Sequence, residues 1–248
     1  MELVRCLVES ILKDATNAQQ RAFHACAKDA LVTMDNTLSF HNQHHILKVL
    51  ESLLEITSEM IFLKSNDIVM LCLVALLHDA GHSGITNHQH AIWNTSVYKS
   101  YGSQSTNEMM HADIAITLLR KHNVFALFPS DVDEDMVRKL ILSTDIVQHP
   151  QYMKDINKSC SKEKLFMIII KSADIFHVAQ CFEECLKWSN LINVELGHMF
   201  DPKNECRFIS NIGVNIFDRL LEMVPCDKFK SYVNQIRVNI QKFASLKY

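Results

Sequence analysis

Glycine and proline are scarce in this chain, which has five and four copies of them among 248 residues. The four prolines lie between helical patterns rather than within them, and no segment alternates cleanly between apolar and polar residues. Proline and glycine interrupt helices, and clean alternation marks half-buried strands, so both absences argue against a β protein. The sequence therefore predicts an all-α fold, a compact multi-helix bundle that forms a single domain over residues 1–248.

Apolar periodicity gives the expected helices of this bundle. They are predicted near residues 2–13, 17–34, 41–63, 66–80, 88–99, 107–122, 130–145, 161–175, 177–196, 205–223 and 227–246.

Membrane and secretion signals are also missing. The longest apolar run, residues 68–77, is too short to span a bilayer, and residues 1–5 lack the basic-then-apolar pattern of a signal peptide. The eight cysteines show no C-x-x-C spacing, which favours reduced core thiols over a disulfide framework. We therefore expect a cytoplasmic protein with no membrane segment.

The charge balance excludes one further class of partner. A net charge of −3 indicates no nucleic-acid-binding surface. It does not exclude a small anionic substrate, because bound metal ions can supply positive charge locally.

Histidine is where the chain departs from an ordinary helical bundle. Two pairs have H-x-x-x-H spacing, which places both side chains on one face of a helix: His41 with His45, and His78 with His82. Asp79 follows His78 at the end of an apolar run, and Asp174 closes another. A carboxylate beside an imidazole suits a divalent cation, because the carboxylate can bridge two ions while the histidine holds one.

Each of these features has an ordinary structural explanation when taken alone. A histidine pair at this spacing arises by chance, and most single histidines on helices are surface or hydrogen-bonded core residues. We expect the remaining surface histidines to include His44, His88, His90, His122 and His198. A carboxylate at a buried helix end, however, is costly without a cation or donors. The combination therefore predicts a two-metal phosphohydrolase.

Several segments resemble, in order from about residue 35 to 225, those of the class I 3′,5′-cyclic-nucleotide phosphodiesterases, a branch of the HD-domain phosphohydrolases. The signature H-D-x-x-H-x-x-x-x-N corresponds to residues 78–87, and F-H-N-Q-H-H at 40–45 resembles the family's Y-H-N-x-x-H. Further similar segments are E-M-M-H at 108–111, T-D-I-V-Q-H at 144–149, S-A-D at 172–174, Trp188, and S-N-I-G at 210–213. The resemblance implies a bundle of the HD-domain and cyclic-nucleotide phosphodiesterase type.

The resemblance also implies roles for the polar residues. His45, His78, Asp79 and Asp174 would hold a tightly bound ion, expected to be Zn²⁺. Asp79 would bridge to a second ion, expected to be Mg²⁺ or Mn²⁺, and a hydroxide between the two ions would be the nucleophile. His41 would be the general acid that protonates the leaving O3′.

Other residues would support these groups or contact the substrate. Those expected to orient the ligands and metal-bound waters are His82, Glu108, His111, Thr144 and Asp145. Those expected to line the substrate pocket are Phe40, His177, Ile192, Asn211 and Val214.

The pocket departs from the family pattern at several positions. Asn211 stands where the family has a purine-binding Gln, and Val214 stands where it has an aromatic clamp that would stack on the base. The stretch from Trp188 to Asn211 is also too short for the long loop that covers the pocket in the family.

Three functions remain open from these residues. The leading one is metal-dependent hydrolysis of cyclic AMP, cyclic GMP or both to 5′-monophosphates. The second is HD-domain hydrolysis of another phosphoester, motivated by the altered base pocket. The third is a catalytically weak cyclic-nucleotide-binding protein, motivated by the short loop and missing clamp.

Overall fold

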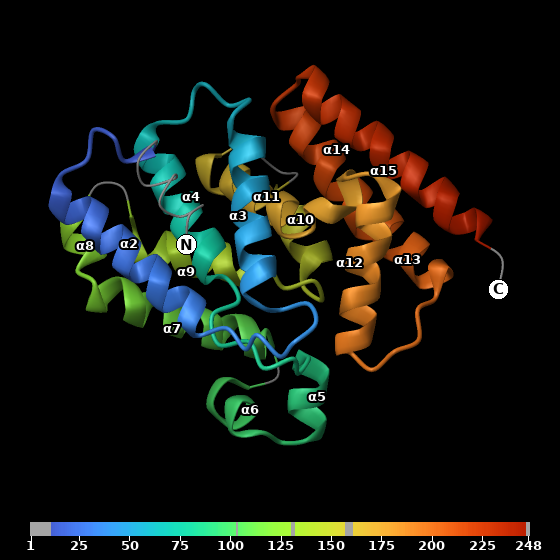
Figure 1. Ribbon diagram of the computed structural model, residues 1–248, viewed down its shortest axis with the longest axis horizontal. Helices are drawn as coiled ribbons and strands as arrows, with labels where there is room; N and C mark the ends of the chain where they lie inside the picture. Colours follow the sequence, from blue (N-terminus) through green and yellow to red (C-terminus); the bar gives the residue numbers. More distant parts are fainter. Residues whose placement is uncertain (1–10, 103, 130–131, 157–160, 247–248) are drawn as a thin grey trace.

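The computed structural model describes residues 11–102, 104–129, 132–156 and 161–246, whose regular secondary structure is entirely helical (Figure 1). This confirms the all-α prediction. The first half contains α2 (Asn17–Val32), α3 (Gln43–Thr57), α4 (Ser65–Leu77), α5 (Asn87–Ile92), α6 (Ser96–Tyr101), α7 (Thr106–Lys121), α8 (Val124–Leu127) and α9 (Glu134–Leu142). The second half contains α10 (His149–Ile156), α11 (Lys162–Asp174), η1 (Phe176–Ala179), α12 (Phe182–Glu195), α13 (Pro202–Phe208), the π-helix η2 (Ile209–Gly213), α14 (Val214–Met223) and α15 (Asp227–Ser245).

Helix α4 lies at the centre of the core. Its residues are apolar on every side, and each one from Val69 to Leu77 is buried, as expected for a helix surrounded by others. Helix α3 packs against both α4 and α11. In Figure 1, α3 crosses the middle of the view, with α2, α7 and α8 on one side and α12 to α15 on the other. The C-terminal ends of α4 and α11 consequently lie inside the molecule, where the polar residues His78 and Asp79 are buried.

Several helix boundaries differ from the predicted ones. The helix predicted from residue 41 begins at Gln43, because the side chain of Asn42 accepts hydrogen bonds from the backbone N–H groups of His44 and His45 and so caps it. The predicted helix 88–99 is two short helices, with Asn94 between them in the left-handed region at φ 48°. Helices α8 and α10 were not predicted, and most of the predicted helix 2–13 lies outside the described residues.

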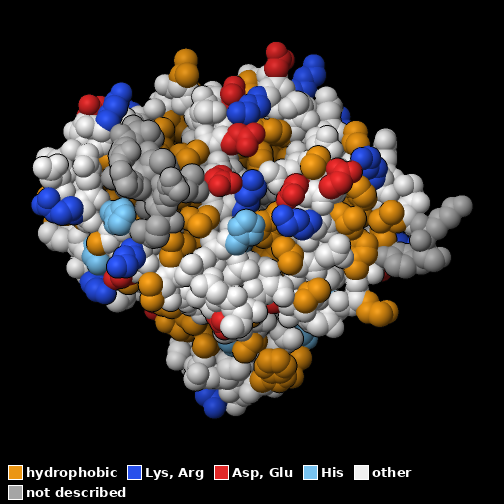
Figure 2. Space-filling view, viewed as in Figure 1, with side chains coloured by type: hydrophobic (Ala, Val, Ile, Leu, Met, Phe, Trp, Pro, Cys, Tyr) orange, Lys and Arg blue, Asp and Glu red, His pale blue; other side chains and the backbone are white. Residues whose placement is uncertain are grey.

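The chemistry of the surface and the thiols agrees with most expectations. No helix among the described residues is long and apolar enough to cross a bilayer. Acidic and basic side chains are interspersed over the upper part of the face in Figure 2. The described cysteines are all free thiols. Cys26, Cys72 and Cys185 are buried as expected, whereas Cys181 is exposed.

One of the expected surface histidines is not on the surface. His90 is buried, and its Nδ1 lies 2.7 Å from the hydroxyl of Thr95. This bond joins the end of α5 to the N-cap of α6. The prediction for His90 was therefore wrong, because its side chain contacts Thr95 and Asn107 of the following helices instead of facing solvent.

Candidate metal centre

Four predicted ligands meet where three helices end or begin. His45 lies in the first turn of α3, His78 is the C-cap of α4 and Asp79 follows it, and Asp174 is the last residue of α11. Because α3, α4 and α11 pack against one another, these helix ends meet although His45 and Asp174 are 129 positions apart in the chain.

The donor atoms of these residues form a compact set. His45 Nε2 lies 3.3 Å from both Asp79 Oδ2 and Asp174 Oδ1. His78 Nε2 lies 3.2 Å from Asp79 Oδ2 and 3.4 Å from Asp174 Oδ1. Ligand bonds of roughly 2.1 Å place neighbouring donor atoms roughly 3.0–3.4 Å apart around one ion. The four spacings therefore fit joint ligands of a single divalent cation.

Two buried nitrogens support the same interpretation. The Nε2 atoms of His45 and His78 are buried and have no hydrogen-bond partner, because the nearby carboxylates are not aligned to accept from them. The other ring nitrogen of His78 donates to the carbonyl oxygen of Ala75 at 2.9 Å, which leaves the Nε2 lone pair facing Asp79 and Asp174. Unpartnered buried nitrogens are costly, and a cation would satisfy both of them. The residues present fit the metal ion that the sequence predicts.

The electrostatics of the four residues favour a cation as well. Burial lowers the pKa of His78, but the carboxylates of Asp79 and Asp174 outweigh it, so the pKa stands well above its usual value. The pKa of His45 is raised by the same carboxylates against the same opposing effect of burial. Burial raises the pKa of Asp79, but the imidazoles of His78 and His45 more than offset this and hold it well below its usual range. This strongly negative field attracts either protons or a metal ion.

A second group of polar residues adjoins this set on α7 and at the end of α9. The His111 Nε2 atom is buried, unpartnered and 4.0 Å from Asp79 Oδ1, and its Nδ1 donates to the carbonyl of Ala80. Burial lowers the pKa of His111 to about 4, so the ring is neutral at pH 7. Burial and the charge of Asp145 raise the pKa of Glu108 to about 7. Excess negative charge with a neutral imidazole fits a second cation or the waters around it.

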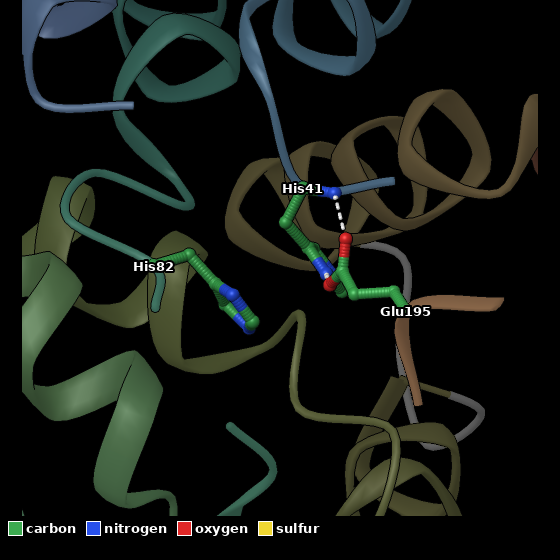
Figure 3. Close-up of side chains that lie close together, drawn as sticks. All are labelled: His41, His82 and Glu195. Atoms are coloured by element: carbon green, nitrogen blue, oxygen red, sulfur yellow. Dashed lines mark hydrogen bonds and ion pairs between the residues drawn. The ribbon is translucent and has the colours of Figure 1, made fainter. Parts of the chain in front are cut away.

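His41 has a partner that the sequence did not reveal. Its ring Nδ1 makes a very short hydrogen bond with the carboxylate of Glu195, at the C-terminal end of α12 (Figure 3). The other carboxylate oxygen of Glu195 accepts from the backbone N–H groups of Phe40 and His41, at 2.7 and 2.9 Å. A carboxylate can only accept here, so Nδ1 carries a proton and Nε2 is the atom left for chemistry.

His82 stacks on the ring of His41, with centroids 3.8 Å apart and planes 18° from parallel (Figure 3). His82, His41 and Glu195 are close enough to be considered as a metal site. However, His82 Nδ1 accepts from the N–H of Gly84 at 3.0 Å. Burial and neighbouring His41 hold the pKa of His82 well below its usual value, so the proton of the neutral ring is on Nε2. Both nitrogens of His82 and the Nδ1 of His41 are therefore already occupied by hydrogens or hydrogen bonds, so this cluster offers a metal ion few free donor atoms.

The H-x-x-x-H spacing predicted that each histidine pair would share one helix face. The structure shows that neither pair does. His41 precedes the cap of α3, and α4 ends at Leu77, before His82. Gly81 lies at φ 78° in the turn between them, where a Cβ would also come within 2.7 Å of Ile114. Turns rather than helical periodicity bring the histidines together, although His41 and His45 still have ring centroids 5.8 Å apart.

The comparisons with known proteins agree with this geometry. The family profile described as 3′5′-cyclic nucleotide phosphodiesterase matches residues 40–221, nearly three quarters of the chain. The chain belongs to the 3′,5′-cyclic nucleotide phosphodiesterase family.

Relatives of this family differ in how much of their length the chain matches. 3′,5′-cyclic-nucleotide phosphodiesterase 2 of Saccharomyces cerevisiae is 26% identical over 72% of this chain and 39% of its own length. A dual specificity calcium/calmodulin-dependent 3′,5′-cyclic nucleotide phosphodiesterase of Drosophila melanogaster is 26% identical over 67% of this chain and 22% of its own. The chain thus spans well under half the length of these two relatives.

The fold is similar to a solved member of the family. The phosphodiesterase domain of the Salpingoeca rosetta rhodopsin phosphodiesterase superposes with a TM-score of 0.82, over 98% of this chain and 87% of that one, at 16% identity. This match confirms the predicted bundle of the cyclic-nucleotide phosphodiesterase type.

The predicted pocket residues of this phosphodiesterase-family chain lie in the segment before α3 and on η1, α12, η2 and α14. Phe40 is buried, and its ring centroid is 4.6 Å from that of His45 and 6.3 Å from that of His177 on η1. Asn211 lies on the π-helix η2, which packs on η1 at Gly213, where a Cβ would meet Val178 at 3.2 Å. Val214 begins α14, and Ile192 lies on α12 one turn before Glu195.

Most of these predicted pocket residues are at least partly exposed. Asn211 is exposed, and Ile192, His177 and Val214 are partly so. The connection between α12 and α13 spans only residues 196–201, as the short spacing after Trp188 predicted. Trp188 packs against Phe40 and His45, with its ring centroid 5.6 Å and 6.0 Å from theirs.

Proposed function

We propose that this chain hydrolyses 3′,5′-cyclic nucleotides to 5′-monophosphates. The observation that carries the proposal is one group of side chains: two buried, unpartnered imidazole nitrogens and two carboxylates that are largely shielded from solvent. They lie beside His41, whose ring is held by Glu195. Family membership supports the choice of reaction.

The proposed reaction needs two metal ions, and residues of this centre would hold each of them. His45, His78, Asp79 and Asp174 would ligate the tighter ion, for which two nitrogens and two oxygens suit Zn²⁺. Asp79, with His111 and Glu108 near it, would hold a more hydrated ion such as Mg²⁺ or Mn²⁺. When bound, such ions polarise the phosphate and make hydroxide available at neutral pH.

His41 supplies the proton of the reaction. A water oxygen bonds to phosphorus and loses one proton to solvent while the P–O3′ bond breaks, and O3′ leaves with the electron pair. The proton on His41 Nε2 moves to that oxygen, and the Glu195 carboxylate holds the ring in place through Nδ1. A positioned general acid of this kind typically contributes about 10²–10⁴-fold to the rate. His82, Thr144 and Asp145 would orient the groups around this step.

The substrate pocket supports cyclic nucleotides with weak selection at the base. The amide of Asn211 offers one donor and one acceptor to a purine edge, and Val214 offers no aromatic face. Phe40, His177 and Ile192 would contact the rest of the nucleoside. We propose that cyclic AMP and cyclic GMP are both substrates, since an amide can present either its oxygen or its nitrogen.

A second candidate follows from the exposure of the residues expected to bind the base. Asn211 is exposed and the clamp position carries valine, so the hydrolytic centre could act on a phosphoester without a purine. This alternative predicts turnover of bis(p-nitrophenyl) phosphate with none of either cyclic nucleotide.

We also propose that the chain works as one catalytic domain in the cytoplasm. The free thiols of the described cysteines suit a reducing compartment.

The direct test is turnover of cyclic AMP, cyclic GMP and bis(p-nitrophenyl) phosphate, with the products separated by chromatography. The proposal predicts 5′-monophosphates from the cyclic nucleotides. Hydrolysis of the nitrophenyl ester alone favours the second candidate, and binding of cyclic nucleotides without any turnover favours a binding protein.

A further inference from the structure

The hydroxyl of Ser105 makes its hydrogen bond to a residue outside its own helix. Ser105 is the N-cap of α7, a position where serine usually accepts a hydrogen bond from the first turn, but no such bond is made here. Its hydroxyl instead donates to Asp145 Oδ2 at 2.6 Å, across 40 residues of chain. Both residues are buried.

The backbone of Ser105 has an unfavourable conformation. It lies in the left-handed region at φ 51° and ψ 43°, which a residue with a Cβ seldom adopts. Such conformations persist where the surrounding structure over-determines them, often at functional sites. The surrounding structure therefore fixes the backbone of Ser105 as well as its hydroxyl.

The hydroxyl completes the immobilisation of Asp145. Oδ1 of Asp145 already accepts from the backbone N–H groups of Val147 and Gln148, at 2.7 and 3.4 Å, and Ser105 holds the opposite oxygen. The carboxylate is thereby fixed in rotation, and Oδ2 keeps one lone pair for a further donor.

The bond also joins two segments next to the candidate metal centre: the start of α7, which carries Glu108 and His111, and the residues after α9. Ser105 lies three and six residues before Glu108 and His111 on α7, while Asp145 follows α9. The charge of Asp145 acts on Glu108, and the charge of Asp79 acts on both Glu108 and His111. The Ser105–Asp145 bond thus fixes the start of α7 relative to these charges.

We propose that Ser105 is a positioning residue for the second, weaker divalent cation of this centre, acting through Asp145. This inference rests on the proposed two-metal hydrolysis. Removing a partner that orients metal-site groups typically lowers metal affinity or activity about 10–100-fold. Loss of the hydroxyl should therefore weaken the second ion and leave the His45–His78–Asp79–Asp174 site loaded.

The test is Mn²⁺ titration of the zinc-loaded protein, with free Mn²⁺ followed by electron paramagnetic resonance. Ser105→Ala removes the hydroxyl, and Ser105→Gly removes it while relieving the backbone conformation. Ser143→Ala is the matched control, because Ser143 is a buried serine whose hydroxyl donates to the carbonyl of Leu140 instead. Zinc content and the melting temperature are measured for each variant.

We expect both Ser105 variants to raise the Kd for Mn²⁺ at least about tenfold, with zinc content and the control unchanged. The Mn²⁺ concentration for half-maximal turnover should rise equally, while kcat at saturating Mn²⁺ recovers. Unchanged binding in Ser105→Ala, or normal binding in Ser105→Gly alone, would overturn the proposal. Zinc-loaded wild-type protein that binds no Mn²⁺ would instead overturn the two-metal function itself, and this inference with it.

Discussion

His41 and Glu195 are 154 positions apart, and a single carboxylate holds both the ring and the backbone of that histidine. One oxygen of Glu195 binds the ring Nδ1, and the other accepts from the N–H groups of Phe40 and His41. Glu195 therefore fixes the segment before α3 and the tautomer of His41 together. It joins α12 to the proposed general acid, so its loss should affect proton transfer rather than metal binding.

Glu195→Gln should lower kcat about 100-fold, because the amide keeps the shape of the side chain but cannot stabilise a protonated imidazole. Steady-state kinetics and zinc content check this together, with zinc expected at the wild-type level. Glu183→Gln, an exposed change at the start of the same helix, is the control. A full loss of zinc in Glu195→Gln would show that Glu195 supports the metal site instead.

His41→Ala should lower kcat by about 10²–10⁴-fold, because the leaving O3′ then departs without a proton donor. Zinc and manganese binding should be retained, since His41 is not among the four proposed ligands. The measurement is single-turnover hydrolysis with metal content determined on the same sample. Wild-type turnover in this variant would show that another group is the acid.

Asp174→Asn should lower zinc affinity at least about 10–100-fold, because the two imidazole nitrogens lose one of their two neighbouring carboxylates. Competition with a chromogenic chelator measures the affinity. Asp218→Asn is the matched control, as Asp218 is a surface partner of Arg237 at 3.8 Å. Equal zinc affinity in both variants would place the ion elsewhere.

The stabilisation by zinc should grow as pH rises from 6 to 9. In the metal-free protein the pKa values of His45 and His78 are raised, so their protonated forms stabilise the fold below the usual pKa of about 6.5, and this stability is lost as pH rises through the folded values. Zinc replaces those protons and binds more tightly at higher pH. Melting temperatures of zinc-loaded and chelated protein should therefore diverge with pH; a constant or narrowing gap would contradict the assignment of these ligands.

Val214→Phe should lower KM for a cyclic nucleotide several-fold, since an aromatic face at this position adds roughly 0.5–1.5 kcal/mol of stacking on the base. Val214 is partly exposed at the start of α14, so a larger ring has room. Kinetics with cyclic AMP and bis(p-nitrophenyl) phosphate separate the effects, because only the nucleotide has a base to stack on. Equal changes for both substrates would show that position 214 does not face the base.

Most residues of the candidate metal centre could be singled out from the sequence because they sit in short local patterns. His78 and Asp79 are adjacent, His45 lies in a histidine-rich segment, and Asp174 closes an apolar run, so each is visible within a few residues. The wrong detail was the helical spacing: a cap at Asn42 and a left-handed Gly81 place His41 and His82 in turns. Turn geometry of this kind competes with periodicity and is hard to read from one sequence.

Glu195 and Ser105 could not be predicted for a different reason. Glu195 looks like any acidic residue on an amphipathic helix, and Ser105 like an ordinary N-cap. Each acquires its role only through a tertiary hydrogen bond, 154 and 40 residues away. Helix α10 was missed because Pro150 stands at its second residue, where proline is tolerated but where we expected a connection.

The measurement that tests the central claim most directly is kcat/KM for cyclic AMP and cyclic GMP in one metal-depletion and reconstitution series. Purified protein is assayed as isolated, after chelation, and after adding back Zn²⁺ and Mn²⁺, with His41→Ala carried through the same series to exclude a contaminating enzyme. The account predicts 5′-monophosphate release that chelation abolishes and the two ions restore in wild-type protein only. Undiminished turnover in the metal-free protein, or none with both ions bound, would contradict it.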